Sequence, residues 1–434
     1  MIDSTLRICS PVVCVALFAM PAPASINPHC FDAVELAPGA PFTAQAMNDQ
    51  GMLVGTSNDR MAVLIDGELA VVTTFPESSG AVINESGQAA GLGRYGLFQD
   101  DRLVRRNTDG SVQVLATVTG SGGWSHLMDI NESGSIVGNY SGGSGSSDWT
   151  AFTWSDDDGF QLIAPDLDFS YFTGIDENDR VCGYIQVDGT YTAATWTDGV
   201  MTTYEDLPDM EDSSASWGFA DDGRVLMSGR PDSEFVFFWY DTDTGARQDI
   251  HVFPYPTYSL RNTFSGNGSI AFSWSDTSTA PYAARWSYEN GFEEITLVDP
   301  IVGFTVSGIN DDGIVIGTSF ELPFYDQRAK LWAEAPFLIN LDSNLEAEPL
   351  SSFARSINSA GQVQLDATGV PMLLDPRCEG DVNSDGATDV SDLLQVISDW
   401  STDGGGPCGS DGNDDGIVNV NDLLNVIANW NSCD

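Results

Sequence analysis

Two acidic loops near the end of the 434-residue chain carry its clearest candidate chemistry. Residues 381–392 (DVNSDGATDVSD) are matched thirty residues later by residues 411–422 (DGNDDGIVNVND). Each loop has side-chain oxygens at positions 1, 3, 5, 9 and 12, and a glycine at position 6. This spacing suits a hard cation with about six to eight oxygen ligands, because the glycine allows the sharp turn between them. The two loops therefore predict two Ca²⁺ sites.

The ligands of both sites follow from these positions, with the main-chain carbonyl of position 7 added. For the first site they are Asp381, Asn383, Asp385, Ala387, Asp389 and Asp392. For the second site they are Asp411, Asn413, Asp415, Ile417, Asn419 and Asp422. One such loop is a moderate signal and two in tandem are a strong one, so a chance acidic run is the weaker explanation.

One helix is predicted after each loop. Apolar residues recur at helical spacing through residues 390–400 and again through residues 420–430, and the two segments share seven of their eleven residues. Neither loop has the entering helix of an ordinary EF-hand, and each ends in Asp instead of Glu. The elements that position the oxygens are thus two loop-and-helix units in tandem.

Residues 378–434 resemble a type I dockerin domain in this arrangement of loops and helices. The resemblance implies calcium-dependent folding and docking onto a cohesin module, with either helix able to dock because the two are so similar. Cellulosomal dockerins usually carry a basic pair where this chain has Ile397 and Ser398 in one helix, and Ile427 and Ala428 in the other. The predicted partner is therefore a cohesin-like module.

The charge of the chain excludes several classes of function. It has 64 acidic and 16 basic residues, a formal net charge of −48. Nucleic acids and anionic membranes need a basic surface, so both are excluded as partners. With 42% apolar residues the chain can still bury a large core, which makes the acidity a surface property. Its three histidines lie far apart, which excludes an HExxH zinc site and argues against a Ser-His-Asp triad.

A longer repeat fills most of the chain before the loops. A five-residue phrase, typified by residues 309–313 (INDDG), occurs eight times. Its last position falls at residues 51, 87, 134, 179, 223, 268, 313 and 361. Each copy has short apolar runs around it that predict four strands per repeat, which is typical of a β-propeller blade. The predicted fold is an all-β propeller followed by a small α-helical domain; eight blades are favoured and seven are possible, because one spacing is only 36 residues.

The two ends of the repeat region are expected to meet in one blade. The last repeat lacks a strand, whereas an extra apolar segment, residues 34–37, precedes the first repeat. This segment is predicted to complete the last blade and close the ring, which removes exposed sheet edges. Closure would also bring Cys30 close to Cys378.

Cysteines at the domain edges predict disulfides. Cys30, Cys378, Cys408 and Cys433 allow three connectivities, and the sequence alone does not choose among them. Ring closure favours Cys30–Cys378 with Cys408–Cys433, whereas a Cys378–Cys433 bond would mean that the C-terminal domain joins its own ends. Cys182 lies in an apolar run and is expected to be a small buried hydrophobe.

The N-terminus has the pattern of an export signal. Arg7 precedes an apolar stretch and a small-residue cleavage site at residues 22–24 (APA). The apolar stretch is about half the length that spans a bilayer, so no permanent anchor is expected. The predicted organisation is a signal peptide at residues 1–24, a propeller at residues 30–377 and a dockerin domain at residues 378–434, in a protein secreted or held at the cell surface.

The repeats resemble the bacterial extracellular HAF repeat family. The resemblance rests on phrases such as residues 308–317 (GINDDGIVIG) followed by residues 329–332 (AKLW), and it covers about residues 31–375. It implies export and a repeat fold, and it brings no catalytic residues. The same phrases could also be calcium loops or, at residues 84–86 (NES), glycosylation sites. Hairpin turns are favoured, because all eight copies lie between predicted strands.

One face of the propeller is the predicted ligand site. By similarity to WD-repeat propellers, the loops that enter the innermost strands share a face with those between the second and third strands. The candidate residues in these loops are Trp124, Trp149, Tyr171, Trp217, Arg261 and Arg355. Aromatic rings stack on sugars and scarce arginines suit an anionic ligand. Packing between blades is the favoured alternative for the aromatic residues.

Three functions fit these features. The favoured one is a secreted, non-catalytic binding or scaffold protein, whose propeller recognises a glycan or a protein and whose dockerin attaches it to a partner. The second is a polysaccharide-degrading glycoside hydrolase or lyase that carries a dockerin, for which no catalytic residues emerge from the sequence. The third is a structural surface protein. A pair of acids about 5–10 Å apart in the central channel would favour the enzyme.

Overall fold

The computed structural model describes residues 26–430 apart from short internal segments. The segments left out are residues 37–40, 74, 76, 95–99, 119–124, 142–147, 209, 211–212, 232–233, 255–258, 276–280, 298–300, 323–325, 334–337, 346–348, 350, 379, 384, 386, 405–408 and 413–415. The side chains of residues 26–30, 254 and 259–261 are not described either. The predicted signal peptide, residues 1–24, lies outside the described residues. The chain divides into two compact units, residues 28–376 and residues 377–434 together with those before 28.

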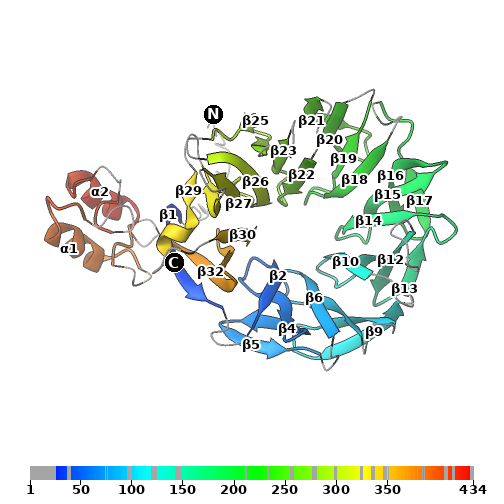
Figure 1. Ribbon diagram of the computed structural model, residues 1–434, viewed down its shortest axis with the longest axis horizontal. Helices are drawn as coiled ribbons and strands as arrows, with labels where there is room; N and C mark the ends of the chain where they lie inside the picture. Colours follow the sequence, from blue (N-terminus) through cyan, green and yellow to red (C-terminus); the bar gives the residue numbers. More distant parts are fainter. Residues whose placement is uncertain are drawn as a thin grey trace, which may run out of the picture. The chain divides into compact units, whose positions relative to one another are not determined.

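The first unit consists of eight four-stranded sheets, arranged around a ring as the blades of a propeller (Figure 1). Blade 1 has β2 (Thr43–Met47), β3 (Leu53–Ser57), β4 (Arg60–Ile65) and β5 (Glu68–Val71). Blade 2 has β6 (Glu77–Ile83), β7 (Ala89–Arg94), β8 (Asp101–Arg106) and β9 (Val112–Val118). Blade 3 has β10 (Ser125–Ile130), β11 (Ile136–Ser141), β12 (Trp149–Ser155) and β13 (Gly159–Ile163). Blade 4 has β14 (Ser170–Ile175), β15 (Val181–Val187), β16 (Thr190–Thr197) and β17 (Val200–Thr203).

The remaining four blades repeat this order. Blade 5 has β18 (Ser214–Phe219), β19 (Val225–Gly229), β20 (Glu234–Tyr240) and β21 (Arg247–Pro254). Blade 6 has β22 (Ser259–Phe264), β23 (Ile270–Ser275), β24 (Tyr282–Ser287) and β25 (Gly291–Glu294). Blade 7 has β26 (Ile301–Ile309), β27 (Val315–Glu321), β28 (Asp326–Trp332) and β29 (Ile339–Asn340), followed by a 3-10 turn, η1 (Leu341–Asn344). Blade 8 has β30 (Ser352–Ile357), β31 (Val363–Ala367) and β32 (Val370–Cys378), and its fourth strand is β1 (Ile26–Glu35).

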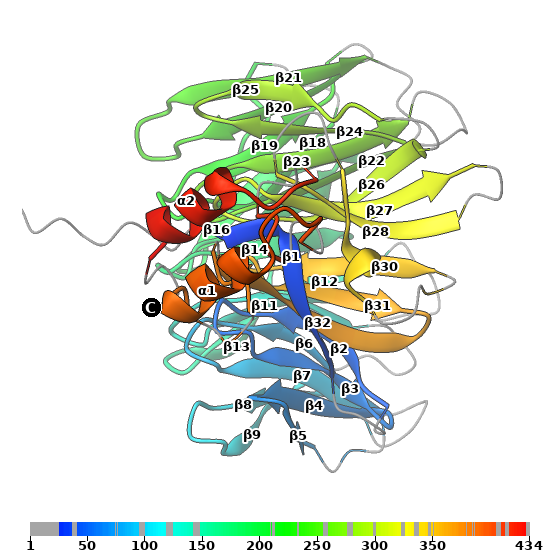
Figure 2. The same ribbon diagram turned by 90° about the vertical axis from the view of Figure 1, so that its left-hand side faces the viewer.

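The N-terminal strand completes the last blade, which confirms eight blades and excludes seven. The strand order in that sheet is β1-β32-β31-β30, and Leu36 N donates a hydrogen bond to Pro371 O at 2.9 Å. Figure 2 shows β1 beside β32, although the two strands lie at opposite ends of the propeller sequence. The strand starts at Ile26 and is therefore longer than the predicted segment at residues 34–37. Closing the ring in this way pairs a sheet edge that would otherwise be exposed.

The propeller core lies between neighbouring blades. Alternation along each strand sends one set of side chains towards each adjoining sheet. Phe237 and Trp239 of β20, for example, pack in one cluster with Ile270 and Phe272 of β23, and all four are at most 1% exposed. The short apolar runs predicted as strands in each repeat therefore fill the space between two blades.

The repeated phrases form hairpin turns between the first and second strands, and these turns also join the blades. Asn84 Oδ1 accepts a hydrogen bond from the main chain of its own turn, and Gly87 has a φ of +83°, as favoured from the sequence. The Nδ2 atom of the same Asn84 donates to Asn131 O of blade 3 at 2.9 Å. Asn358 of blade 8 donates to Asn48 O of blade 1 at 3.1 Å, so the same link is present where the ring closes.

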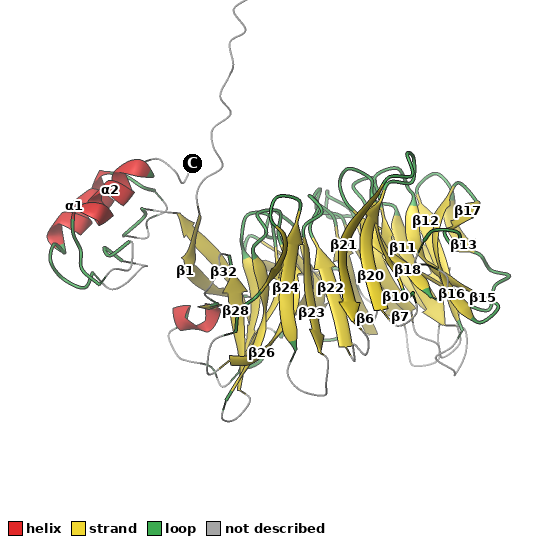
Figure 3. Ribbon diagram, turned by 90° about the horizontal axis from the view of Figure 1, so that it is seen from above, coloured by secondary structure: helices red, strands yellow, loops and turns green. Residues whose placement is uncertain are grey.

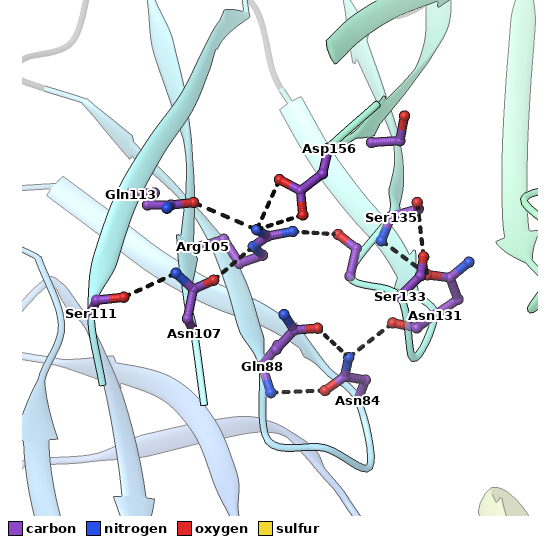
Figure 4. Close-up of polar contacts among 12 residues, drawn as sticks. Asn84, Gln88, Arg105, Asn107, Ser111, Gln113, Asn131, Ser133, Ser135 and Asp156 are labelled. Carbon is purple, nitrogen blue, oxygen red and sulfur yellow. Dashed lines mark hydrogen bonds and ion pairs between the residues drawn. The ribbon is translucent and has the colours of Figure 1, made fainter. Parts of the chain in front are cut away.

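A buried arginine adds a second link at the junction of blades 2 and 3 (Figure 4). Arg105 of β8 is 3% exposed, and its Nη1 donates to Gly134 O in the turn of blade 3 at 3.1 Å. Its Nη2 forms an ion pair with Asp156 at 3.1 Å, and the guanidinium lies 4.7 Å from the ring centroid of Trp154. One side chain thus satisfies a turn carbonyl, an acid and an aromatic face of the next blade.

Two further arginines make the same connection. Arg180 Nη2 donates to Gly223 O at 2.8 Å, from blade 4 to blade 5. Arg285 Nη1 donates to Gly313 O at 2.7 Å, from blade 6 to blade 7. The scarce arginines of this acidic chain therefore stabilise blade junctions in three places.

The second unit contains two α-helices, α1 (Val390–Ser398) and α2 (Val420–Ala428). With η1 they are the helices of the described part of the chain, and Figure 3 shows helices in red and strands in yellow. None of the helices in the described residues is long and apolar enough to cross a membrane.

Only part of the cysteine prediction falls on described residues. Cys182 is a free, fully buried thiol, as expected, and burial raises its pKa to about 12. Cys378 is disulfide-bonded, whereas the side chains of Cys30, Cys408 and Cys433 lie outside the described residues. Both predicted pairings therefore stay predictions.

Candidate functional site

The ends of the two acidic loops are built into the starts of the helices. Asp389 caps α1, because its Oδ1 accepts from Ser391 N at 2.6 Å, while Asp392 Oδ2 accepts from Asp389 N at 2.8 Å. Asn419 and Asp422 form the same capping box at the start of α2. Such a reciprocal pair satisfies main-chain donors that a helix leaves open at its first turn. Positions 9 and 12 of both predicted ligand sets are thereby placed by helix capping.

The first loop brings four of its predicted ligand residues together. Asp392 Oδ1 accepts from Asn383 N at 3.0 Å, which joins position 12 to position 3. Asp385 N donates to Asp381 Oδ1 at 3.2 Å and to Asn383 Oδ1 at 2.9 Å. Positions 1, 3, 5 and 12 therefore lie around one turn of the main chain. Ala387 is exposed, and its N–H donates to Asp385 Oδ1 at 3.1 Å.

The second loop is described at its two ends. Asp411 Oδ2 accepts from Gly416 N at 2.8 Å, and Gly416 has a φ of +85°, as the sharp turn at position 6 requires. Ile417 is 47% exposed, and its carbonyl accepts from Asn419 Nδ2 at 2.9 Å. Two of the predicted ligands, Asn413 and Asp415, lie outside the described residues.

The charge and burial of the loops fit a hard divalent cation. The carboxylates of positions 1 and 12 are at most 8% exposed in both loops: Asp381, Asp392, Asp411 and Asp422. Residues 378–434 contain twelve acidic residues and no Lys, Arg or His. Buried carboxylates are costly unless a cation offsets them, and an all-oxygen donor set is what Ca²⁺ or Mg²⁺ takes.

The metal geometry itself is not formed by the described side chains. No group of three or more His, Cys, Asp and Glu residues in the described part of the chain is arranged to hold a metal ion. In the first loop, the carboxylates instead accept hydrogen bonds from nearby main-chain N–H groups. The two Ca²⁺ sites therefore remain a prediction from the sequence.

The two helices bury one face and expose another. α1 and α2 contact each other, and their small core consists of Val396, Val418 and Val426, with Leu393 and Leu423 packed against it. Outside this core, four large apolar residues in or just after each helix are 44–59% exposed. These are the α1 face (Val390, Leu394, Ile397 and Trp400) and the α2 face (Val420, Leu424, Ile427 and Trp430). The unit thus presents the same apolar surface twice.

Four of the six side chains predicted on the propeller face are described, and the structure brings two of these four together. Trp149 and Tyr171 have ring centroids 5.6 Å apart. Trp217 lies on blade 5 and donates from Nε1 to Ser228 Oγ at 2.9 Å. Arg355, on blade 8, forms an ion pair with Asp366 at 3.2 Å. Trp124 and the side chain of Arg261 lie outside the described residues.

Four aromatic residues beside that pair were missed from the sequence. Trp149 and Tyr171 belong to a cluster that also contains His126, Phe169, Tyr184 and Tyr191. Phe169 and Tyr171 are two residues apart, and this spacing places both on one side of an extended chain. That spacing was the available signal, whereas Tyr184 and Tyr191 come from strands that only the sheet pairing places nearby.

Asp129 and Glu177 are neighbouring carboxyls at the junction of blades 3 and 4. Asp129 accepts from Ile130 N at 2.8 Å and from Ile175 N at 3.0 Å, so it bridges blades 3 and 4. Burial raises the pKa of Asp129 to about 6, and the charge of Glu177 adds to the rise. Glu177 in turn accepts from Glu132 N at 3.1 Å. Both carboxyls therefore link blades 3 and 4.

These raised pKa values predict a propeller that is more stable at mildly acidic pH. The pKa of Asp129 is higher in the folded protein than its ordinary value of 3.8, so the folded state binds the proton more tightly. Stability is then lost as the pH rises through about 4 to about 6, by up to about 3 kcal/mol for this group. Burial raises the pKa of Glu85, Glu177 and Asp221 as well, which adds to the trend.

The measurement is the thermal midpoint of the propeller between about pH 7.5 and about pH 5. We expect the midpoint to rise as the pH falls, and the rise to be smaller in Asp129→Asn. The control is Asp109→Asn, because hydrogen bonds from Ser111 lower the pKa of Asp109 and take it out of this range. An equal rise in wild type and Asp129→Asn would contradict the assignment.

No family model and no curated protein sequence matches the chain. Among solved structures, it is similar to dipeptidyl peptidase 4 of Porphyromonas gingivalis, with a TM-score of 0.51 and 10% identity over 78% of this chain and 59% of that one. A streptogramin B lyase matches with a TM-score of 0.41 and 13% identity, over 80% of this chain and 98% of that one. The β-propeller domain of the Trilobed protease from Pyrococcus furiosus matches with a TM-score of 0.44 and 11% identity, over 72% of this chain and 99% of that one. At these identities the likeness concerns the propeller fold alone.

Proposed function

We propose that residues 378–434 are a dockerin-type module, which folds around two Ca²⁺ ions and docks the protein onto a cohesin-like partner. In this proposal residues 1–24 direct export, residues 30–377 are a non-catalytic propeller of HAF-type repeats that binds a glycan or protein ligand, and the protein acts outside the cell or at its surface. Disulfides Cys30–Cys378 and Cys408–Cys433 belong to the same proposal.

The repeated apolar face is the observation that carries the proposal. The three helical residues of the α1 face, Val390, Leu394 and Ile397, are four and three residues apart and so lie on one side of the helix. The α2 face repeats the same spacing thirty residues later. Exposed apolar groups of this size cost free energy in water, and they usually mark a surface that a partner covers. A module with no basic residue and two such faces is suited to docking.

The composition of these faces indicates the chemistry of the partner. Ile397 and Ile427 are 48% and 47% exposed, at the places where cellulosomal dockerins usually have a basic residue. Each face therefore offers aliphatic groups and one tryptophan in place of a positive charge. The partner that fits is a cohesin-like module with an apolar contact surface, where such groups are buried at the centre of the interface.

The loops support the calcium dependence. Asp392 and Asp422 connect the loops to the helix starts, so an ion held by the loops would also fix the orientation of α1 and α2. Ca²⁺ supplies positive charge to a segment that has none of its own, and ligand binding by the folded form alone stabilises that form.

The test measures binding of the full-length chain to immobilised type I cohesin modules. One set of modules has apolar contact surfaces and the other has charged ones. Binding is measured in Ca²⁺ and then in excess chelator. We expect binding to the apolar set in Ca²⁺ and its loss in chelator. Binding that is equal in both conditions, or absent from the whole set, would reject the docking function. The propeller alone, residues 28–376, is the matched control and should not bind.

A further inference from the structure

The cluster of six aromatic side chains on blades 3 and 4 forms a second candidate interaction surface. We call it the aromatic surface, and it consists of His126, Trp149, Phe169, Tyr171, Tyr184 and Tyr191. Neighbouring ring centroids are 5.3–6.4 Å apart, in an unbroken series from His126 to Tyr191.

The rings are held by contacts beneath and beside them. Phe169 is 8% exposed and lies nearly parallel to both Tyr171 and Tyr184, at interplanar angles of 20° and 25°. Asn139 is fully buried; it donates to Phe172 O at 2.8 Å and accepts from Phe172 N at 2.8 Å. This two-bond link joins blade 3 to blade 4 next to Tyr171. The surface is therefore preorganised, which lowers the entropy that a ligand loses on binding.

The other rings remain accessible. His126 is exposed, Tyr191 is 41% exposed, and Trp149, Tyr171 and Tyr184 are half-buried. Their strands place them on one face of the propeller, because each residue lies near a loop that enters a first strand or joins a second strand to a third. Four of them, Trp149 and the three tyrosines, combine a broad apolar ring with one polar group at its edge.

The charges of residues 125–191 argue against an anionic ligand. Residues 125–191 contain one arginine and no lysine. That arginine, Arg180, is engaged by Asp176 at 2.6 Å and by Gly223 O at 2.8 Å. Two carboxylates of the same segment, Asp168 and Asp188, are exposed. Acidic groups repel an anion, whereas they accept hydrogen bonds from hydroxyl groups.

We propose that the aromatic surface binds a neutral glycan chain. The apolar C–H faces of successive sugar rings would lie on the aromatic rings, and their hydroxyl groups would bond to the tyrosine hydroxyls and nearby carboxylates. This inference rests on the propeller being the ligand-binding part of the proposed function, and it replaces the anionic ligand expected from the arginines. Of the two arginines proposed there, Arg355 pairs with Asp366, and the side chain of Arg261 is not described.

The test uses the full-length protein and soluble polysaccharides in affinity electrophoresis. The neutral probes are xyloglucan, xylan, galactomannan and mixed-linkage glucan, and polygalacturonate is the anionic probe. We expect retardation by at least one neutral probe and none by polygalacturonate. Trp149→Ala and Tyr191→Ala should each weaken that binding about tenfold, the usual effect of losing one stacked ring. Tyr191→Phe keeps the ring and should weaken binding of the neutral probe less than Tyr191→Ala does.

The matched control is Tyr282→Ala, an equally exposed tyrosine on blade 6, which should bind as wild type does. The proposal is overturned if no neutral probe is retained, if only polygalacturonate is retained, or if both variants bind as tightly as wild type. Circular dichroism of each variant checks that the propeller is folded. Repeating the assay in chelator separates this inference from the docking function, because the aromatic surface contains no predicted calcium ligand.

Discussion

Removal of calcium is expected to unfold residues 378–434 while the propeller stays folded. In differential scanning calorimetry of the full-length chain, Ca²⁺ should give two transitions, and excess chelator should abolish the one that belongs to the C-terminal unit. The physical reason is charge: twelve acidic residues and no basic one occupy this segment, and four of its carboxylates are at most 8% exposed. Each buried carboxylate without a cation costs several kcal/mol, which exceeds what so small a core provides.

Two variants sharpen this prediction. Asp392→Asn removes a charge that lies at the end of the first loop and bonds to both Asn383 N and Asp389 N. This substitution should lower the midpoint temperature of the C-terminal transition and leave that of the propeller transition unchanged. Asp403→Asn is the control, because Asp403 is an exposed acid of the same unit outside both loops. A C-terminal transition that is unchanged by chelator would show that the unit folds without metal.

The second large effect concerns the two helix faces and requires a double variant. Leu394 and Leu424 occupy equivalent places and are 59% and 54% exposed. Leu394→Asp or Leu424→Asp alone should leave docking nearly intact, because the other face remains. Together they should weaken docking at least about hundredfold, since each face would then bury an unpaired charge. The assay is the cohesin binding measurement in Ca²⁺.

The matched control makes the same kind of substitution, an exposed aliphatic residue to an acid, on the propeller. Val200 is 65% exposed on blade 4, so Val200→Asp also replaces an exposed aliphatic residue by an acid. It should dock as wild type does. Complete loss of docking in either single variant would show that only one face is used, and full docking by the double variant would show that neither is.

The eight-bladed fold was predictable because each repeat carries its own turn. The side chain of Asn84 bonds within its own turn, and Gly87 adopts the positive φ that the phrase implies, so a local pattern defines the hairpin. Ring closure was also predictable, because one strand was missing at one end of the repeats and one was extra at the other. The predicted strand was too short, since its N-terminal half lacks a clear apolar alternation.

Features that depend on the pairing of strands were not predictable. In seven of the eight blades the register of the first and second strands shifts by one residue, as at Ser216/Gly218, and the shift leaves Trp217 out of the regular pairing. A spacing of two along the sequence does not reveal such a bulge. The arginine links are missed for a similar reason, because Arg105 and Gly134 are 29 residues apart and meet only when two blades pack.

The candidate sites also differ in how far the sequence alone could predict them. The calcium loops are short and continuous, so the sequence alone places every predicted ligand within twelve residues. The aromatic surface draws on residues 126 to 191 and on two blades, and the sequence brought out only Trp149 and Tyr171. Of the two arginines predicted to bind a ligand, Arg355 forms an ion pair with Asp366, and the side chain of Arg261 is not described.

Isothermal titration of the full-length chain with Ca²⁺ tests the central claim most directly. We expect two ions per chain, one ion in Asp381→Ala or Asp411→Ala, and none when both substitutions are combined, because each removes position 1 of one loop. Tyr282→Ala should still bind two ions. A wild-type chain that takes up no Ca²⁺, or one whose uptake is unaffected by the double substitution, would contradict the calcium-dependent docking module.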